Sequence, residues 1–370
     1  MRPEVISLFK HYPLLKDKLP YVSLGEFPTP INKLERLGNS IGIGQLYIKR
    51  DDLSGKLYGG NKVRKLEFLL GKALEASARE VLTFGGAGSN HALATALYAQ
   101  QVGLRSISML SPQPNAHYVR RNLLMSYYCG AELHYYQNTL FLDLVTRYQI
   151  LRHKLKHGYF PQVIPLGGSS PLGTIGFVNA AYELREQVMA GQVPEPDCIY
   201  VALGSTGTAV GLILGLKAVN LKSQVIPVKV IGEKIANVGK MVKLFRETNS
   251  YLNSLEPSFP KFEFDGLDID IKYYFSGERY ALFTREGMQA VASMEKEEGF
   301  KLEGTYTGKT FAALIGDAKK QALQDKVVLF WNTYNSRDFS DAIANVDYHQ
   351  LPQEFHHYFE EDVQPLDRHP

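Results

Sequence analysis

Residues 198–211, CIYVALGSTGTAVG, decide the fold class of this chain. The first six residues are apolar and rich in β-branched and aromatic side chains, as in a buried strand. The small residues at 204–208 then predict a tight turn, and a helix is predicted over Gly207–Val219. A strand, a small-residue turn and a helix in this order make a βα unit, the building block of a mostly parallel sheet covered by helices.

The same succession of apolar bursts and helical periods recurs along the chain. Strands are predicted at Gln45–Lys49, Glu80–Phe84, Ser106–Leu110, Cys198–Leu203, Val225–Ile231 and Val327–Trp331. Two more helices are predicted, at Asn61–Ala76 and Asn90–Val102, and each begins close behind glycine. We therefore predict an α/β fold with open, twisted, mostly parallel sheets.

Length and charge narrow the class of protein. With 370 residues the chain is long enough for two domains. No linker rich in Pro, Gly or Ser separates two halves, so we expect the second domain to be inserted into the first. The formal net charge is +3, and basic and acidic residues are interspersed, which argues against a nucleic-acid partner.

Cysteine content and hydropathy predict a soluble, cytoplasmic protein. The two cysteines, Cys129 and Cys198, lack the spacing of a disulfide framework or a structural zinc site. The amino terminus has charges and prolines where a signal peptide needs an apolar run, and no later run has the length of a membrane span. We expect no metal and no membrane partner.

Two long segments carry no clear pattern. Tyr135–Phe160 is rich in aromatic and basic residues, and Lys234–Lys272 is weakly patterned. We interpret both segments as insertions.

The first chemical signal is RDDLSG at residues 50–55, followed by GGNKVRK at 59–65. Lys62 falls in the first turn of a predicted helix. There the positive end of the helix dipole and the like charges of Arg64 and Lys65 favour the neutral amine of Lys62. A neutral lysine amine forms Schiff bases with carbonyl groups. The alternative is an ordinary solvated surface lysine.

The turn GSTGT at residues 204–208 is the second signal. Backbone N–H groups and hydroxyls converge at a helix start of this kind and bind phosphate. The lysine of a Walker loop is missing, and a tight βα turn needs small residues for packing alone. Together with Lys62, the turn indicates a cofactor that has both a phosphate and an aldehyde.

The stretch GGAGSNH at residues 85–91 is a third junction of strand and helix. Its N–H groups suit a substrate carboxylate, whereas a plain helix cap also explains Ser89. A Rossmann-type nucleotide site is the weakest interpretation, because the GxGxxG spacing and its acidic partner are lacking.

Taken in order along the chain, these motifs resemble the D-cysteine desulfhydrase and aminocyclopropane-carboxylate deaminase family of fold-type-II pyridoxal-phosphate enzymes, which are similar to the tryptophan synthase β subunit. The matching stretches are FPTP at 27–30, YIKRDD at 47–52, GGNKVRKLE at 59–67, SNH at 89–91, GGSSPLG at 167–173, GSTGT at 204–208 and TYTGK at 305–309. The resemblance covers nearly the whole chain. It implies two α/β domains with the cofactor between them, and a homodimer.

On this basis we predict a large domain of residues 1–60 and 175–370 and a small inserted domain of residues 61–174. The resemblance also assigns residues to the pyridoxal phosphate. Lys62 carries it as a Schiff base and moves protons, Asn90 contacts its phenolic oxygen, and Thr333 faces the pyridine nitrogen. Its phosphate is cradled by the turn residues Ser205, Thr206, Gly207 and Thr208. Tyr334-Asn335 departs from the family, which usually has a Gly-Gly pair against the ring.

Other residues are assigned to a small amino-acid substrate and to catalysis. Ser89 and the helix start behind it, with Asn90 and His91, receive the substrate carboxylate. Tyr280 and Tyr306 face the substrate, although both have an alternative as core aromatics.

The position after Tyr306 separates two activities within the family. Deaminases that open the cyclopropane ring typically carry Glu there, whereas desulfhydrase-like members carry Thr, as this chain does at Thr307. We therefore expect β-elimination from D-cysteine, in which the Cα proton and the β-thiol leave and aminoacrylate hydrolyses to pyruvate and ammonia. The alternatives are deamination of 1-aminocyclopropane-1-carboxylate or another small amino acid, and a catalytically silent protein that binds pyridoxal phosphate.

Overall fold

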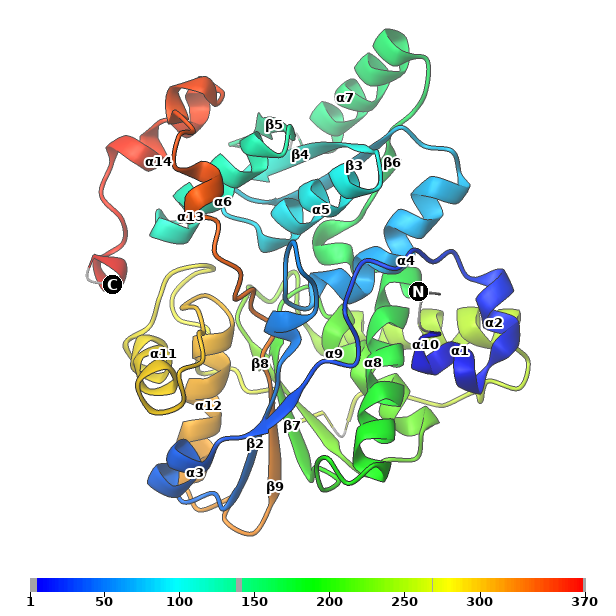
Figure 1. The fold of residues 1–370 in the computed structure, drawn as a ribbon, viewed down its shortest axis with the longest axis vertical. Coiled ribbons are helices and arrows are strands. Elements are labelled where there is room, and N and C mark those ends of the chain that lie inside the picture. Colours follow the sequence, from blue (N-terminus) through cyan, green and yellow to red (C-terminus); the bar gives the residue numbers. More distant parts are fainter. Residues whose placement is uncertain (1–4, 138–141, 268, 369–370) are drawn as a thin grey trace. The chain divides into compact units, whose positions relative to one another are not determined.

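The computed structural model describes residues 5–137, 142–267 and 269–368. By their internal contacts these residues form two compact units. Unit 1 comprises the described parts of Met1–Leu19, Ser23–Phe68 and Ser169–Ser336, and unit 2 those of Pro20–Val22, Leu69–Gly168 and Arg337–Pro370. Each unit contains one mostly parallel sheet, which confirms the predicted α/β class (Figure 1). The predicted division into 1–60 with 175–370 and 61–174 stays a prediction.

The sheet of unit 1 has the strand order β1-β2-β9-β7-β8. The strands are β1 (Ile31–Lys33), β2 (Gln45–Lys49), β7 (Cys198–Leu203), β8 (Gln224–Lys229) and β9 (Val327–Trp331). β1 pairs antiparallel with β2, and the remaining pairs are parallel. The predicted bounds of β2, β7 and β9 are confirmed. β1 was not predicted, because its three residues are exposed or half-buried and form no apolar run.

Helices cover both faces of this sheet (Figure 1). α9 contacts β7 and β8 together with its neighbours α8 and α10, and α12 contacts the same strands together with α11 and α3. The bounds are α1 (Ser7–His11), α2 (Pro13–Lys18), α3 (Glu35–Ile41), α8 (Pro171–Met189), α9 (Gly207–Ala218), α10 (Val238–Leu255), α11 (Arg285–Glu298) and α12 (Thr307–Lys319). The short 3-10 turn η1 (Asp51–Leu53) follows β2, and α4 (Lys62–Glu75) begins in unit 1.

The core of unit 1 joins the sheet to α12. Leu46 and Ile48 of β2 and Phe330 of β9 are buried in one cluster with Phe311 and Leu314 of α12. Complete burial of each such side chain contributes about 1.5–3 kcal/mol. This core fixes the positions of the strands. Because β2, β7 and β9 are parallel, the turns that follow them, at 50–55, 204–208 and 332–336, emerge at the same edge of the sheet.

Helices α8 and α9 approach each other closely because glycines replace side chains between them. A Cβ on Gly211 would lie 2.5 Å from the Phe177 Cβ and 2.6 Å from the Thr174 carbonyl oxygen, and one on Gly215 would lie 2.6 Å from the Ala181 Cβ. These separations are far below van der Waals contact, so only glycine fits at both positions.

Unit 2 has a four-stranded parallel sheet with the order β5-β4-β3-β6. Its strands are β3 (Glu80–Gly86), β4 (Arg105–Ser111), β5 (Glu132–Tyr135) and β6 (Gln162–Val163), and its helices and 3-10 turns are α5 (Asn90–Gln101), α6 (His117–Tyr128), α7 (Leu142–His157), η3 (Leu166–Gly168), α13 (Ser340–Ile343), η4 (Tyr348–Gln350), η5 (Gln353–Phe355), α14 (His357–Glu360) and η6 (Pro365–Asp367). Arg120 of α6 donates to the Tyr358 carbonyl at 2.7 Å, so the C-terminal segment packs on α6. β3, β4 and α5 were predicted to within two residues at each end, and β5 and β6 were not predicted.

The two segments interpreted as insertions contain regular structure. Tyr135–Phe160 holds α7, and its residues 138–141 lie outside the described residues. Lys234–Lys272 holds α10, whose buried residues recur at helical spacing, and its residue 268 lies outside the described residues. Among the described helices, none has both the length and the apolar character that crossing a membrane requires.

Gly211→Val should lower the free energy of unfolding by about 1–3 kcal/mol, because the new side chain meets the backbone of α8 and cannot be relieved by a rotamer change. Urea unfolding followed by circular dichroism measures this loss. Gly44→Ala is the control, since a Cβ there has no atom within 4 Å. Equal stability of the Gly211 variant and the control would contradict the close approach of α8 and α9.

Candidate active site

Lys62 is the first residue of α4, and the loop before it is tightly held. A Cβ on Gly59 would lie 1.9 Å from the Asp52 carbonyl oxygen, and Gly60 has φ +87°. The Gly60 N–H donates to the Asp51 carbonyl at 2.6 Å. We call residues 59–62 the lysine loop. Lys62 is half-buried, and desolvation lowers its pKa to about 8, which favours the neutral amine.

The predicted contribution of Arg64 to this neutral amine is wrong. Its guanidinium donates to Asp51 at 2.7 and 2.9 Å and to Glu183 at 2.8 and 3.0 Å. Burial alone would lower the pKa of Arg64, but the two carboxylates outweigh burial and raise it. Lys65 behaves differently, since burial and the charge of Lys62 both lower its pKa well below the usual value. The neutral form of Lys62 therefore arises from burial.

Two serines and the start of α9 form an anion cradle with Lys65. The Ser169 Oγ lies 2.8 Å from the Ser205 Oγ and accepts hydrogen bonds from the Gly207 N–H and the Lys65 Nζ, each at 3.2 Å. A Cβ on Gly207 would lie 2.7 Å from the Ser169 Oγ and 3.0 Å from the Lys65 Nζ. Glycine is therefore needed at 207 to keep the cradle open. Ser169 and Lys65 were not predicted as part of it.

The other two predicted turn residues complete this turn. Thr206 has φ +70°, a left-handed conformation that costs a threonine energy and persists only where the surroundings enforce it. The Thr208 Oγ accepts a hydrogen bond from the Asn61 Nδ2 at 3.0 Å. The structure thus brings the four predicted turn residues beside the lysine loop, within unit 1.

The groups of the cradle fit pyridoxal phosphate. N–H groups at a helix start, serine hydroxyls and a buried ammonium all favour a bound phosphate. A phosphate beside Lys65 would also restore its charged form, which burial and Lys62 disfavour. Lys62 supplies, within the same unit, an amine of lowered pKa that reacts with an aldehyde.

Tyr280 and Tyr306, both predicted to face the substrate, meet each other. Their hydroxyl oxygens are 2.6 Å apart, and their rings pack edge to face with centroids 6.1 Å apart. A Cβ on Gly204 would lie 3.4 Å from the Tyr306 ring, so the pair stands beside the cradle turn. Neither tyrosine is fully buried, which disfavours the alternative of core aromatics. Burial raises the pKa of Tyr280 and keeps its hydroxyl protonated.

Glu303 holds the turn that carries Tyr306, and it was not predicted. Its carboxylate accepts hydrogen bonds from the N–H groups of Tyr306 at 2.7 Å, Thr307 at 2.9 Å and Thr305 at 2.8 Å. Burial raises the pKa of Glu303, and these N–H groups oppose the rise. A signal was available in the sequence, because a carboxylate just before a helix start commonly binds its free N–H groups.

The segment 333–335 lies against the lysine loop. The Thr333 carbonyl accepts from the Asn61 N–H at 3.3 Å, which places this predicted residue at the site. Asn335 is buried, and its Oδ1 accepts from the Gly59 N–H at 2.7 Å. Asn335, which belongs to the Tyr334-Asn335 departure from the family pattern, therefore holds the loop that precedes Lys62.

Three further predicted residues lie at the start of α5 in unit 2. The Ser89 Oγ accepts from the Ala92 N–H at 3.2 Å, so the helix-cap interpretation of Ser89 is confirmed. The Asn90 Oδ1 accepts from the Asn122 Nδ2 at 3.0 Å, and His91 is buried. Asn122, from α6, was not predicted. The roles assigned to Ser89, Asn90 and His91 stay predictions.

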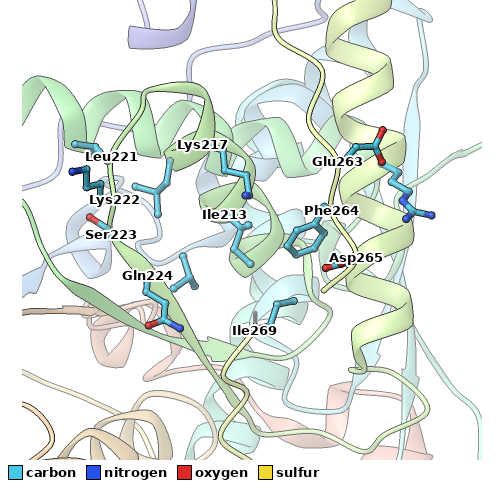
Figure 2. A pocket seen from close by; sticks show the side chains of 13 residues that line it. Ile213, Lys217, Leu221, Lys222, Ser223, Gln224, Glu263, Phe264, Asp265 and Ile269 are labelled. Atoms are coloured by element: carbon cyan, nitrogen blue, oxygen red, sulfur yellow. The ribbon is translucent and has the colours of Figure 1, made fainter. Parts of the chain in front are cut away.

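A cavity of about 620 Å³ opens elsewhere in unit 1, beside α9 and α10 (Figure 2). Lys217 of α9 points toward Phe264 and Asp265 across it, with Ile213 and Ile269 below (Figure 2). The residues that line this cavity do not include any of the predicted site residues. We therefore place the candidate active site at the lysine loop and the cradle.

Several known proteins are similar to this chain. The family model "Pyridoxal-phosphate dependent enzyme" matches residues 22–333. A relative from Pyrococcus horikoshii, provisionally named 1-aminocyclopropane-1-carboxylate deaminase, is 35% identical over 333 residues, which cover 89% of this chain and 94% of the relative. The D-cysteine desulfhydrase of Serratia proteamaculans is 32% identical over 327 residues, which cover 85% of this chain and 94% of the relative.

Solved structures are similar as well. A crystal structure of an ACC deaminase homologue has a TM-score of 0.76 at 34% identity, and the match covers 94% of this chain and 100% of that chain. A threonine deaminase structure has a TM-score of 0.60 at 18% identity and covers 90% of this chain and 98% of that chain, which shows the shared fold alone.

The lowered pKa of Lys62 predicts its reactivity. In the cofactor-free protein the rate of Lys62 acylation should rise with pH to a plateau with its midpoint near pH 8, because the amine reacts only when neutral. Mass spectrometry after brief acetylation across a pH series measures this rate residue by residue. The exposed Lys72 on the same helix is the comparison, and identical midpoints for the two lysines would contradict the burial of Lys62.

Glu303→Gln should lower the free energy of unfolding by about 1–3 kcal/mol. The three N–H groups of residues 305–307 donate to the two carboxylate oxygens of Glu303, whereas a glutamine side chain has only one oxygen that can accept them. Urea unfolding of this variant is compared with that of Glu297→Gln, a substitution at a more exposed glutamate of α11. A loss of the same size in both variants would mean that the N–H contacts of Glu303 are not what stabilises the turn.

Proposed function

Because the chain belongs to the pyridoxal-phosphate dependent enzyme family, we propose that it is a lyase that converts D-cysteine and water to pyruvate, ammonia and sulfide. Relatives named D-cysteine desulfhydrase, at 31–33% identity, support this substrate. When bound, pyridoxal phosphate supplies an aldehyde for the substrate amine and a ring that withdraws electrons from Cα.

The observation that carries the choice of reaction is the side chain of Thr307. It follows Tyr306 directly and is almost completely buried. Its Oγ accepts a hydrogen bond from the Glu303 N–H at 2.9 Å, so it is tied to the turn. No carboxylate stands at this position, where the ring-opening deaminases typically carry Glu. The site therefore favours elimination of a β-substituent over opening of a cyclopropane ring.

Residues of unit 1 perform the proton transfers in this proposal. The Lys62 Nζ removes the proton from the substrate Cα, which its lowered pKa allows near neutral pH. The Tyr306 hydroxyl, 2.6 Å from that of Tyr280, donates a proton to the departing sulfur. Ser205, Thr206, Gly207 and Thr208 of the cradle turn, together with Lys65, would hold the phosphate of the cofactor, and the Thr333 hydroxyl would serve as the partner of its pyridine nitrogen.

Residues of unit 2 bind the substrate and the ring in this proposal. Ser89 and the N–H groups at the start of α5 receive the substrate carboxylate, as helix starts commonly do for anions. Asn90 would contact the phenolic oxygen of the cofactor, and the hydrogen bond that its Oδ1 accepts from Asn122 orients its amide. His91, which is buried on the same turn of helix, is the third residue that we assign to the substrate.

We also propose that the enzyme is a cytoplasmic homodimer. Cys129 and Cys198 are both free and buried, which suits a reducing compartment. The homodimer rests on the resemblance to the family, and light scattering of the purified protein tests it.

A second candidate is 1-aminocyclopropane-1-carboxylate deaminase. The provisional name of the Pyrococcus relative and the similarity to the solved ACC deaminase homologue favour it. This activity would yield a ketoacid and ammonia without sulfide. A catalytically silent relative is a third candidate, motivated by Tyr334-Asn335 in place of Gly-Gly.

The purified holoenzyme should release sulfide and pyruvate in equal amounts from D-cysteine. Lys62→Ala should lower this rate by about a hundredfold to ten-thousandfold, because the proton transfer at Cα loses its base. Lys72→Ala, at an exposed lysine of the same helix, should leave the rate unchanged. Colorimetric sulfide and coupled pyruvate assays on one sample measure both products.

Two other results of these assays would favour the second or the third candidate function. A ketoacid from 1-aminocyclopropane-1-carboxylate, with no sulfide from D-cysteine, would replace the desulfhydrase by the deaminase. A cofactor band that responds to amino acids while no product forms would identify the silent relative.

A further inference from the structure

A second group of ionisable side chains lies in unit 2, where β5 packs beside α7. Glu132 and His134 alternate along β5 and so project to the same face of the strand. His153 comes from α7. One ligand atom from each of these three side chains lies within 4.8 Å of the other two. The proposed enzymatic reaction makes no use of them.

The His153 ring is held as a metal ligand would be held. Its side chain is 3% exposed, and its Nδ1 lies 2.9 Å from an oxygen of the buried Glu80. Its Nε2 has no hydrogen-bond partner among the described residues. This nitrogen lies 3.4 Å from the Glu132 Oε2. A carboxylate on one ring nitrogen, with the other nitrogen presented to a metal, is a recurrent arrangement in zinc sites.

The spacing of the three ligand atoms suits a tetrahedral ion. Zinc bonds of about 2.0–2.1 Å to nitrogen and oxygen place neighbouring ligand atoms roughly 3.3 Å apart. The His153 Nε2 lies 3.4 Å from the Glu132 Oε2, which is close to this value, whereas the His134 Nε2 lies 2.8 Å from the other carboxylate oxygen, Oε1. An ion bound through this carboxylate therefore requires the hydrogen bond between His134 and Glu132 to lengthen by about 0.5 Å. Side chains of Glu132 and His134 are partly exposed, which leaves water for the fourth position.

Cations also face this group and compete with a metal ion. Arg152 of α7 lies 2.8 Å from Glu132, and Arg105 of β4 lies 2.7 Å from Glu80. His157, one helical turn after His153, lies 3.9 Å from Glu80. The Arg152 side chain is 40% exposed, so it can swing into solvent when an ion binds Glu132. An ion that binds this carboxylate must therefore displace Arg152 from it.

We propose that Glu132, His134 and His153 bind one divalent transition-metal ion of the zinc class, with Glu80 orienting the His153 ring. The set of two imidazoles and one carboxylate is one that zinc accepts readily. Such an ion would tie β5 to α7, a helix that exposes Leu144, Tyr148, Leu151 and Leu155 and whose buried side chains are the polar ones of Thr146, Gln149 and His153. We therefore expect the bound ion to stabilise unit 2.

The test uses holoenzyme freed of metal by a chelator and titrated with Zn²⁺ or Co²⁺ in a calorimeter, with the thermal midpoint measured in parallel. One equivalent should bind and raise the midpoint. His134→Ala and Glu80→Gln should each weaken binding by about tenfold to a hundredfold. His349→Ala, at an exposed histidine of the C-terminal segment, is the matched control and should bind as the parent does.

Arg152→Ala separates a metal site from a plain network of ion pairs. Removing the competing guanidinium should strengthen Zn²⁺ binding, whereas a network without a metal would only lose an ion pair and still take up no ion. Failure of the parent to bind one equivalent, or equal binding by the parent and His134→Ala, would overturn the proposal. An unchanged visible spectrum of the bound cofactor confirms that each variant is folded.

Discussion

The buried charge network around Arg64 is the constraint on which the rest of the site depends. Its guanidinium is 1% exposed and bridges Asp51, which follows β2, to Glu183 of α8. Lys49 of β2 donates to the same Glu183, and the Trp331 indole of β9 donates to Asp51 at 2.7 Å. Burial alone would raise the pKa of Glu183, but Arg64 and Lys49 outweigh it and hold the value at about 2. Breaking such a pair typically costs about 3–5 kcal/mol, because the remaining charge stays buried.

The charge network around Arg64 explains why Lys62 is held in place. Arg64 stands two residues after Lys62, so two strands and a helix of unit 1 fix the first turn of α4. Lys65, on the same turn, belongs to the anion cradle, where its Nζ donates a hydrogen bond to the Ser169 hydroxyl. One helical turn thus presents a reactive amine and a phosphate-binding ammonium, three positions apart, on the same side of the helix, and an anchored guanidinium in another direction.

Local patterns predicted most of the fold, whereas the resemblance to the family supplied most of the candidate site residues, whose roles stay predictions. β2, β7 and β9 matched at both ends because buried central strands are continuous apolar runs, whereas β1 and β6 are too short and too exposed to form one. Arg64 was misjudged because closeness in sequence was taken for closeness in space. The contacts of Ser169 and Asn335 were not predicted, because their partners Lys65 and Gly59 lie 104 and 276 positions away along the chain. No periodic signal reports such a pairing.

The most direct test identifies the lysine that carries the cofactor. Borohydride reduction fixes pyridoxal phosphate to whichever amine holds it, and fragment spectra of the tryptic peptides then locate the modification. Lys62 and Lys65 are both candidates on general grounds, since both have lowered pKa values in one helical turn. We predict the modification on Lys62 alone, with Lys65 unmodified because it serves the phosphate. Modification of Lys65, or of a lysine outside this turn, would contradict the assignment of Lys62.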